Sequence, residues 1–357
     1  MRVLQIGSDR SKRGILVPGS PAYLRQKAYA TQFGELDIIG FSLRSDGFSP
    51  HEEKTLRIIP TRSWSKLFFG LDTLRIVRTL QRPAVVSAQD PFETGLLALL
   101  VARMRHVPLH VQVHTDFLSP EYARHSLLNH VRTRIAGFVL RRAARIRVVS
   151  DRIKISLAYT YKGLPEISVL PIFVDLALVR GAADPAIAGR FAHFKTRVLV
   201  VSRLEPEKNV ALAIQAFAAA SPADACLIIV GGGSERAKLE LMARTTPARE
   251  RIFFEGEQSA APYYAFADLL LVTSKYEGYG LVIVEALSCG VPVLSTDVGA
   301  ARDVGAIIAP AEEFDFALND WFRTGARGGH LIGYPYANAG EYISAYCADI
   351  MACTKLN

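Results

Sequence analysis

Short apolar runs alternate with longer helical patterns along nearly the whole chain of 357 residues. In the first half, apolar runs of strand length lie near residues 3–6, 36–41, 84–88, 109–114 and 146–150. Stretches with helical periodicity lie between them, near residues 22–33, 65–81, 94–105 and 127–142. Strands that alternate with helices indicate a parallel sheet covered on both faces. The chain is therefore expected to belong to the α/β class.

A break in this pattern divides the chain. After residue 175 the sequence becomes a stretch of alanine, glycine and aspartate up to residue 189, and a second series of apolar runs begins at Val198. A single core rarely serves more than about 250 to 300 residues, so a chain of 357 residues fits two domains. We predict two facing Rossmann-like, doubly wound domains, at 1–175 and 176–337, with a linker near 171–195. Ligands of such domains bind beyond the carboxyl ends of the strands, here in a deep interdomain cleft.

The charge of the chain is divided unevenly. Residues 1–190 contain 28 Lys and Arg against 15 Asp and Glu, whereas residues 191–357 contain 14 against 19. A basic first half indicates an anionic partner, such as phospholipid headgroups or a lipid-linked diphosphate. Nucleic acid fits less well because no helix-turn-helix, zinc or RNA-binding motif is present.

The segment between Arg62 and Arg82 mixes aromatic and cationic residues at helical spacing. One interpretation is an interfacial helix that contacts a membrane surface. The other is an ordinary helix whose core-facing residues are Leu67, Leu71, Leu74 and Val77.

Several features bear on the compartment. No apolar run reaches the ~18 residues that cross a bilayer, and the first seven residues read as a strand rather than a signal peptide. The four cysteines are far apart and lack metal-ligand spacing: Cys226, Cys289, Cys347 and Cys353. We expect reduced thiols in a cytoplasmic protein, with association at the cytoplasmic face of a membrane as an option.

A glycine-rich turn at 276–280 joins an apolar run at 268–273 to a helical pattern that begins at Leu281. The first amides of a helix have no internal partners and attract anions, and Gly278 and Gly280 let a ligand approach the main chain closely. The turn is therefore a predicted phosphate site.

Two glutamates flank this turn, Glu277 within it and Glu285 in the helix that follows. Such a pair can accept hydrogen bonds from sugar hydroxyls beside the phosphate site. The alternative is that Glu277 replaces a helix N-cap and that Glu285 is an ordinary solvated residue.

A second strand-to-helix turn follows the apolar run at 198–201 and contains Arg203 and Lys208. Arginine supplies a planar fork of donors and lysine a compact charge, which together suit a diphosphate. They would neutralise the charge of a departing nucleoside diphosphate. The alternative is a basic pair on an ordinary surface loop.

Four segments taken together resemble the retaining, GT-B-fold glycosyltransferases of family 4. They are Ser-Arg-Leu-x-Pro-x-Lys-Asn at 202–209, Val-Gly-Gly-Gly at 230–233, Phe-x-Gly at 254–256 before Tyr-Tyr-x-x-Ala-Asp at 263–268, and the glutamates at 277 and 285. In the first half, the segments 89–95 and 113–116 are similar to the acceptor side of such enzymes. The usual Gly-Gly loop near the N-terminus is replaced by Pro-Gly-Ser-Pro at 18–21.

The resemblance implies a GT-B fold whose last helix, within 338–357, crosses back to the first domain. It also implies a retaining hexosyltransferase that moves a sugar from a nucleoside-diphosphate donor, UDP before GDP, to a hydroxyl of a lipid-linked glycan or polysaccharide precursor. Because side chains and helix amides neutralise the phosphates, and because no Asp-x-Asp pair is present, we expect neither a metal nor another cofactor.

Roles follow for the candidate residues under this resemblance. The donor diphosphate is expected between Arg203, Lys208 and the amides of Tyr279, Gly280 and Leu281, with Glu277 on the donor sugar and Glu285 on the ribose. The base is expected near Gly231 and Gly256. On the first domain the expected contacts are His114 to the donor sugar, Gly19 and Ser20 to the phosphates, and Gln89, Asp90 and Asp116 to the acceptor. For His114 a purely structural role is the alternative.

Two other functions remain open at this point. A nucleotide-sugar epimerase uses a similar pair of domains, and a decayed transferase fold would bind a nucleotide sugar without catalysis. Hydrolase, zinc and nucleoside triphosphatase motifs are absent, and Gly231 to Gly233 lack the spacing of a dinucleotide-binding loop.

Overall fold

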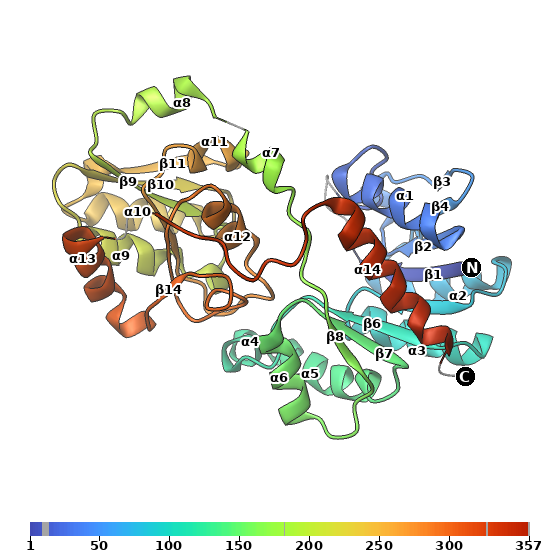
Figure 1. Cartoon of the computed structure of the whole chain (residues 1–357). Helices are drawn as coiled ribbons and strands as arrows, with labels where there is room; N and C mark the ends of the chain where they lie inside the picture. Colours follow the sequence, from blue (N-terminus) through green and yellow to red (C-terminus); the bar gives the residue numbers. More distant parts are fainter. Residues whose placement is uncertain (9–13, 182, 326–327, 356–357) are drawn as a thin grey trace. The chain divides into compact units, whose positions relative to one another are not determined.

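The computed structural model describes residues 1–8, 14–181, 183–325 and 328–355. The chain forms two compact units, unit 1 with Met1–Leu170 and Tyr336–Asn357, and unit 2 with Pro171–Pro335 (Figure 1). Each unit is built on a mainly parallel sheet with helices on both faces, as the alternating pattern predicts. The change from unit 1 to unit 2 lies at the start of the segment that the sequence identifies as a linker.

The sheet of unit 1 has the strand order β3-β4-β2-β1-β5-β6-β7-β8. Among the described strands of this sheet, β3 alone pairs antiparallel with its neighbour. The strands are β1 (Arg2–Gly7), β2 (Glu35–Gly40), β3 (His51–Glu52), β4 (Leu56–Pro60), β5 (Val85–Ala88), β6 (Leu109–Val113), β7 (Arg145–Val148) and β8 (Ile167–Val169). The strand order reverses between β1 and β5, and in doubly wound sheets ligands bind at the carboxyl ends beside such a reversal.

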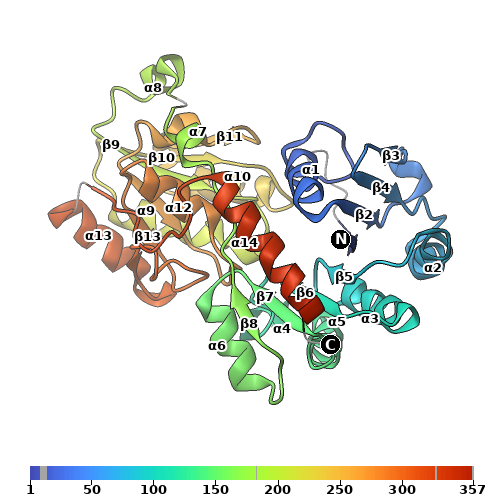
Figure 2. The ribbon, with the colours of Figure 1, turned by 45° about the vertical axis from the view of Figure 1, so that its right-hand side comes forward.

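Two groups of helices cover this sheet. On one face, α1 packs beside α14, and on the other face, α3 lies beside α5 (Figures 1 and 2). The helices of unit 1 are α1 (Pro21–Phe33), α2 (Phe69–Thr79), α3 (Glu93–Arg105), α4 (Pro120–His125), α5 (Leu127–Leu140), α6 (Asp151–Thr160) and α14 (Ala339–Ala352).

Helix α14 joins unit 1 through a polar network that is buried against the sheet. The guanidinium of Arg147 on β7 donates to Gln112 Oε1 at 2.8 Å and to the Tyr342 hydroxyl at 3.1 Å. The rings of Tyr29 on α1 and Tyr346 on α14 stack at 4.2 Å between centroids. Because buried polar groups are costly when unpaired, this network fixes where α14 docks.

The segment between Arg62 and Arg82 is expected to form one helix under both interpretations of its sequence, and the structure differs from that expectation. A 3-10 turn (Lys66–Phe68) precedes α2, so the helical pattern is not one continuous helix. Of the four residues expected to face the core, only Val77 is buried, and Leu67 and Leu71 are 90% and 54% exposed. The predicted core-facing stripe is therefore wrong: Leu67 lies in the 3-10 turn, outside the helical period, and α2 buries Thr73 and Val77 in place of Leu71.

The sheet of unit 2 is entirely parallel, with the order β11-β10-β9-β12-β13-β14. Its strands are β9 (Thr196–Val201), β10 (Ala225–Val230), β11 (Ile252–Gly256), β12 (Leu269–Val272), β13 (Val293–Ser295) and β14 (Ile307–Ile308). Its helices are α7 (Leu176–Arg180), α8 (Pro185–Arg190), α9 (Val210–Ala220), α10 (Arg236–Thr245), α11 (Ala261–Tyr264), α12 (Leu281–Ser288) and α13 (Phe314–Thr324). The strand order reverses between β9 and β12.

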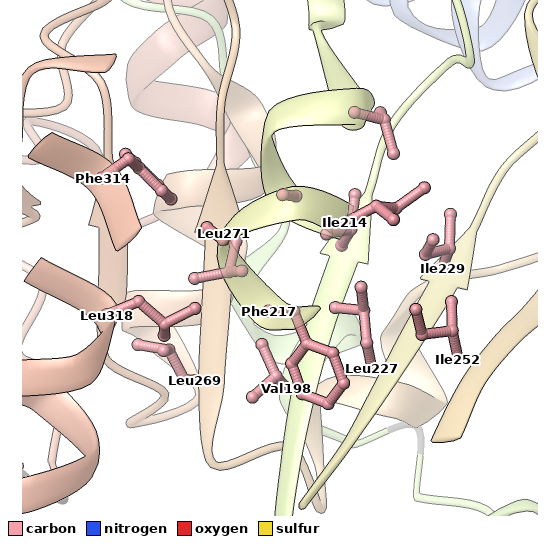
Figure 3. Packing of buried hydrophobic residues seen from close by; sticks show 14 of the residues in the cluster. Val198, Ile214, Phe217, Leu227, Ile229, Ile252, Leu269, Leu271, Phe314 and Leu318 are labelled. Atoms are coloured by element: carbon pink, nitrogen blue, oxygen red, sulfur yellow. The ribbon is translucent and has the colours of Figure 1, made fainter. Parts of the chain in front are cut away.

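One face of this sheet packs against α9 and α13 to form the core of unit 2 (Figure 3). Phe217 of α9 lies against Val198 and Leu227 of the strands, and all three side chains are fully buried. Burying a side chain of this size contributes about 1.5–3 kcal/mol. This core holds β9 and β12 together and so fixes the position of the loops that follow them.

Within the described part of the chain, no helix combines the length and the hydropathy that a membrane span requires.

Candidate functional site

The loops that follow β9 and β12 lie side by side where the strand order of unit 2 reverses. Strands β9 and β12 pair directly in the sheet. Beyond their ends, the Lys275 amide donates to the Glu207 carbonyl at 2.8 Å, and the Thr273 hydroxyl donates to the Lys208 carbonyl at 3.3 Å. The two charged turns of the sequence therefore form one site at the place where doubly wound sheets bind ligands.

An ion pair between Lys208 and Glu277 joins these two loops. Lys208 Nζ lies 2.5 Å from Glu277 Oε1, and the two side chains are only 16% and 15% exposed. The Ser274 hydroxyl donates to the same Glu277 oxygen at 2.8 Å. Glu277 is thus held in place by two donors, and the helix N-cap position of α12 belongs to Gly280 instead. The alternative in which Glu277 caps the helix is excluded.

Arg203 is held less tightly than Lys208. Its guanidinium donates to Glu207 Oε1 at 2.8 Å, and its side chain is 70% exposed. Exposed pairs of this kind contribute little to stability, so the side chain is available to a ligand at low cost.

The start of α12 lies directly beyond β12. Gly280 has a φ of 91°, a conformation that strains other residues, and the Tyr279 carbonyl accepts a hydrogen bond from Ala300 at 2.9 Å. Tyr279 is buried, whereas Leu281 is 37% exposed. The positive end of the α12 dipole is therefore presented beside the Lys208–Glu277 pair.

A pocket of about 390 Å³ opens beside the end of β9. It is lined by Val201, Ser202, Arg203, Val230, Gly231, Gly232, Gly233, Glu257, Gln258 and Val282. At Gly231 a Cβ atom would lie 1.8 Å from the Ser202 carbonyl oxygen, so no larger residue fits there. The Gly231 amide donates to the Gly256 carbonyl at 2.7 Å, which brings the two glycines of the predicted base site together.

Glu285 lies one turn along α12 from Val282, which lines the pocket. The Tyr264 hydroxyl donates to Glu285 Oε2 at 2.8 Å. Burial raises the pKa of Glu285, and the hydrogen bond from Tyr264 opposes that shift. The carboxyl group is therefore partly buried and oriented by a phenol, unlike the solvated glutamate of the alternative interpretation.

Sequence reasoning did not assign a role to Tyr264 or its neighbour Tyr263. The Tyr263 hydroxyl donates to Glu255 Oε2 at 2.7 Å and accepts from Gln258, which lines the pocket. The two tyrosines of α11 thus hold Gln258, which lines the pocket, and Glu285, which lies one helical turn from it. The Tyr-Tyr-x-x-Ala-Asp segment was the available signal, but the sequence does not show which carboxylates the hydroxyls reach.

The candidates in unit 1 lie at or near the carboxyl ends of its strands, and Asp90 follows β5. Burial raises the pKa of Asp90 and that of Asp116, which lies beyond the end of β6. Asp90 Oδ1 accepts a hydrogen bond from the Phe92 amide at 2.8 Å, so part of its role is structural.

His114 follows β6 directly and is partly exposed. The surrounding protein desolvates its imidazolium, and together with the charges of Arg147 and Arg25 this lowers the pKa of His114 to about 3. The side chain is therefore a neutral imidazole near pH 7, able to donate one hydrogen bond and accept another.

The loop before α1 holds Gly19 and Ser20. Ser20 is the N-cap of α1, since its Oγ accepts from the Tyr23 amide at 3.0 Å and donates to the Gly14 carbonyl at 2.8 Å. Gly19 is exposed with a φ of 79°. The hydroxyl of Ser20 is engaged in the helix cap, so the exposed main chain at Gly19 is the better candidate for a phosphate contact.

Among the described residues, no group of three or more His, Cys, Asp or Glu side chains is arranged to hold a metal ion. The charged groups at the end of β9 and β12 are instead one lysine, one arginine and their carboxylate partners.

Two family models match this chain. "Glycosyltransferase Family 4" matches residues 28–178, and "Glycosyl transferases group 1" matches residues 189–306. Together they include most of both units, and the second contains every candidate residue of unit 2.

Curated relatives are glycosyltransferases. The chain is 36% identical over 106 residues to N-acetyl-alpha-D-glucosaminyl L-malate synthase of Bacillus anthracis, a match to 29% of this chain and 28% of that enzyme. It is 27% identical over 287 residues to a GDP-mannose-dependent alpha-mannosyltransferase of Mycobacterium tuberculosis, covering 76% of this chain and 73% of that enzyme. The match to the first enzyme thus spans under a third of its length.

Solved structures share the fold over the whole chain. The Anabaena protein HepE, crystallised with UDP-glucose, has a TM-score of 0.70 at 19% identity, with 100% of this chain and 97% of HepE covered. The match supports the GT-B class for the two α/β units.

Proposed function

The chain belongs to the group 1 glycosyltransferases, and on that premise we propose that it transfers a sugar from a nucleoside diphosphate to an acceptor hydroxyl, with retention of configuration and without a metal ion. The observation that carries the proposal is the Lys208–Glu277 pair at the reversal of strand order in unit 2. It places a cation and a carboxylate beside the start of α12.

The proposed diphosphate site consists of Lys208, Arg203 and the first amides of α12. A lysine ammonium has three N–H donors, and Glu277 uses one, so the others can bind phosphate oxygens. Arg203 adds a planar fork once it turns from Glu207. These groups would stabilise the negative charge that develops on the leaving nucleoside diphosphate.

The two glutamates would hold the sugar and the ribose. Lys208 and Ser274 both bind Oε1 of Glu277, which leaves Oε2 for a hydroxyl of the donor sugar. In Glu285, Tyr264 binds Oε2, which leaves Oε1 for a ribose hydroxyl. Since one oxygen of each carboxylate is already fixed, the other is oriented before the donor binds.

The nucleotide base would occupy the pocket that Gly231 and Gln258 help to line. Close approach of the base to the main chain is possible because Gly231, Gly232 and Gly233 carry no side chains. The donors named for similar proteins include GDP-mannose and UDP-glucose. UDP is our first choice.

The acceptor would approach from unit 1. Its net charge suits an acceptor linked to a lipid diphosphate, or a polysaccharide precursor at an anionic membrane surface. Neutral His114 would hydrogen-bond the donor sugar, and Asp90 and Asp116 would accept bonds from acceptor hydroxyls. The segment with exposed Leu67 and Leu71 would contact the membrane interface at the cytoplasmic face.

One experiment separates this function from its two rivals. Purified protein is incubated with UDP-glucose, UDP-N-acetylglucosamine or GDP-mannose, with and without a lipid-diphosphate-linked sugar acceptor, and donor consumption is followed. A transferase consumes donor with the acceptor and an epimerase converts the donor sugar without it. A non-catalytic binder does neither, although a nucleotide still raises its Tm.

A further inference from the structure

Helices α3 and α5 expose an apolar face in unit 1 that the fold does not use. Six side chains with exposed fractions from 42% to 85% form it: Leu96, Leu100, Met104, Leu127, Val131 and Phe138. Their spacing places three on one stripe of each helix. Since α3 packs beside α5, the two stripes form one surface, here named the α3–α5 face. Apolar surface gathered on one face indicates an interaction site.

Cations are interspersed with these apolar side chains. Arg103 follows Leu100 on the stripe of α3, and Arg134 lies between Val131 and Phe138 on that of α5. The sequences of α3 and α5 contain a single acidic residue, Glu93, and it is paired with Arg132 at 2.9 Å. The face is thus apolar and positively charged at once.

A groove of about 660 Å³ continues this face at the ends of the two helices. Arg103, His106 and Arg142 line it together with apolar residues. The Arg142 guanidinium lies 3.8 Å from the centre of the Phe138 ring, which connects the groove to the apolar stripe. Helix carbonyls that would repel an anion are already bonded here, since Phe138 O accepts from Arg142 and His106 O from Arg82.

We propose that the α3–α5 face docks on an anionic phospholipid bilayer, with the arginines on lipid phosphates and the apolar side chains among the first acyl carbons. Apolar side chains mixed with arginine match the depth profile of a membrane interface. A second copy of this chain fits less well, because a two-fold contact would set arginine against arginine. This docking proposal rests on the proposed function in one respect only, which is that the acceptor is located at a membrane.

The test is co-sedimentation of the full chain with two kinds of vesicle. One contains phosphatidylcholine alone, and the other also contains about 30 mol% phosphatidylglycerol as the anionic probe lipid. We expect binding to the anionic vesicles, weakened by salt. Arg103→Gln with Arg134→Gln should lower the partition coefficient about fivefold for each arginine, and Leu100→Gln with Phe138→Gln should lower it about tenfold.

The matched control is Leu241→Gln with Arg244→Gln on α10 of unit 2, where both residues are exposed. The proposal would be overturned if the α3–α5 variants bound anionic vesicles as well as the control variant does. It would also be overturned if the wild-type protein showed no preference for anionic vesicles. A wild-type oligomer that the α3–α5 variants convert to monomers without lipid would overturn it as well. The vesicle assay contains no sugar donor, so its result does not depend on transferase activity. A protein that binds anionic vesicles but transfers no sugar would contradict the proposed function and would still support docking through the α3–α5 face.

Discussion

His110 Nε2 on β6 lies 3.0 Å from Asp349 Oδ2 on α14, and the two residues are 239 positions apart in the chain. On its other side, His110 Nδ1 lies 3.0 Å from the Ser87 hydroxyl, which itself accepts from Gln112. Ser87 therefore donates to Nδ1, and the proton of a neutral His110 lies on Nε2, directed at Asp349. Arg145 donates to the other oxygen of Asp349 at 2.5 Å.

Asp349→Ala should destabilise unit 1 strongly. The variant leaves Arg145 and His110 without their shared carboxylate partner, and removing one partner of a buried pair costs about 3–5 kcal/mol. Urea unfolding followed by far-UV circular dichroism at pH 7 measures this loss. Asp315→Ala on α13, whose carboxylate lies near the surface of unit 2, is the control. Equal midpoints for the two variants would show that the pair does not hold α14.

Acid should weaken the same contact. Burial raises the pKa of Asp349, but the hydrogen bonds from His110 and Arg145 outweigh it and lower the pKa to about 2, against a usual 3.8. Because the folded pKa is the lower one, this stability is present above about pH 4 and is lost towards pH 2, about 2.5 kcal/mol in all. Burial also lowers the pKa of His110, so its share is lost as the pH falls below 6.5.

His110→Gln isolates the histidine contribution, because a glutamine amide still bonds but does not titrate. The difference in unfolding free energy between wild type and His110→Gln should shrink from pH 7 to pH 5. A difference that stays constant with pH would mean that His110 does not titrate on unfolding.

Lys208→Ala and Glu277→Gln should each reduce kcat by about a hundredfold or more, and each should also lower the Tm because it breaks a mostly buried ion pair. Each removes a group proposed to act on charge or orientation in the transition state. Steady-state kinetics with the best donor provides the measurement, and Lys238→Ala on the surface of α10 is the matched control. An unchanged rate in either variant removes that residue from the mechanism.

Tyr264→Phe should weaken nucleoside diphosphate binding about tenfold, because Glu285 loses the donor that orients it. The sharper readout is the ratio of affinities for the ribonucleotide and its 2′,3′-dideoxy analogue, measured by calorimetry. This ratio should fall in Tyr264→Phe. If both affinities fall equally, Tyr264 supports the fold of the pocket rather than the ribose contact.

Activity should persist in EDTA. The proposed phosphate contacts are Lys208, Arg203 and the α12 amides, which need no divalent ion. Initial rates with about 5 mM EDTA and with added Mg²⁺ should agree within about twofold. Loss of activity that Mg²⁺ restores would contradict the metal-independent mechanism.

Much of the fold could be predicted because each buried strand is a compact apolar run. Val198 and Leu271 lie in such runs, and both are buried in β9 and β12. The 64–71 segment was harder, since Leu67 and Leu71 have the spacing of a core stripe but are exposed. Hydrophobic period alone does not show that a 3-10 turn interrupts the pattern.

The candidate site was predictable in its charged members and not in their partners. Lys208 and Glu277 stand next to strand ends, and the topology of the sheet brings those ends together. Ser274 lies in the same loop as Glu277 and Tyr264 in a recognisable segment, but the sequence does not show that their hydroxyls orient the two glutamates. Their roles depend on tertiary contacts, which a single sequence does not display.

The return of the chain to unit 1 through α14 has a consequence for biosynthesis. Most of unit 1 emerges from the ribosome before unit 2, but the helix that covers the polar groups of its sheet, Arg147 and His110 among them, is made only after unit 2. All of unit 2 is synthesised in between, as an insertion between two parts of unit 1. During translation, the first unit to be started is therefore the last to be completed, and a chain cut short before α14 would release it with this face uncovered.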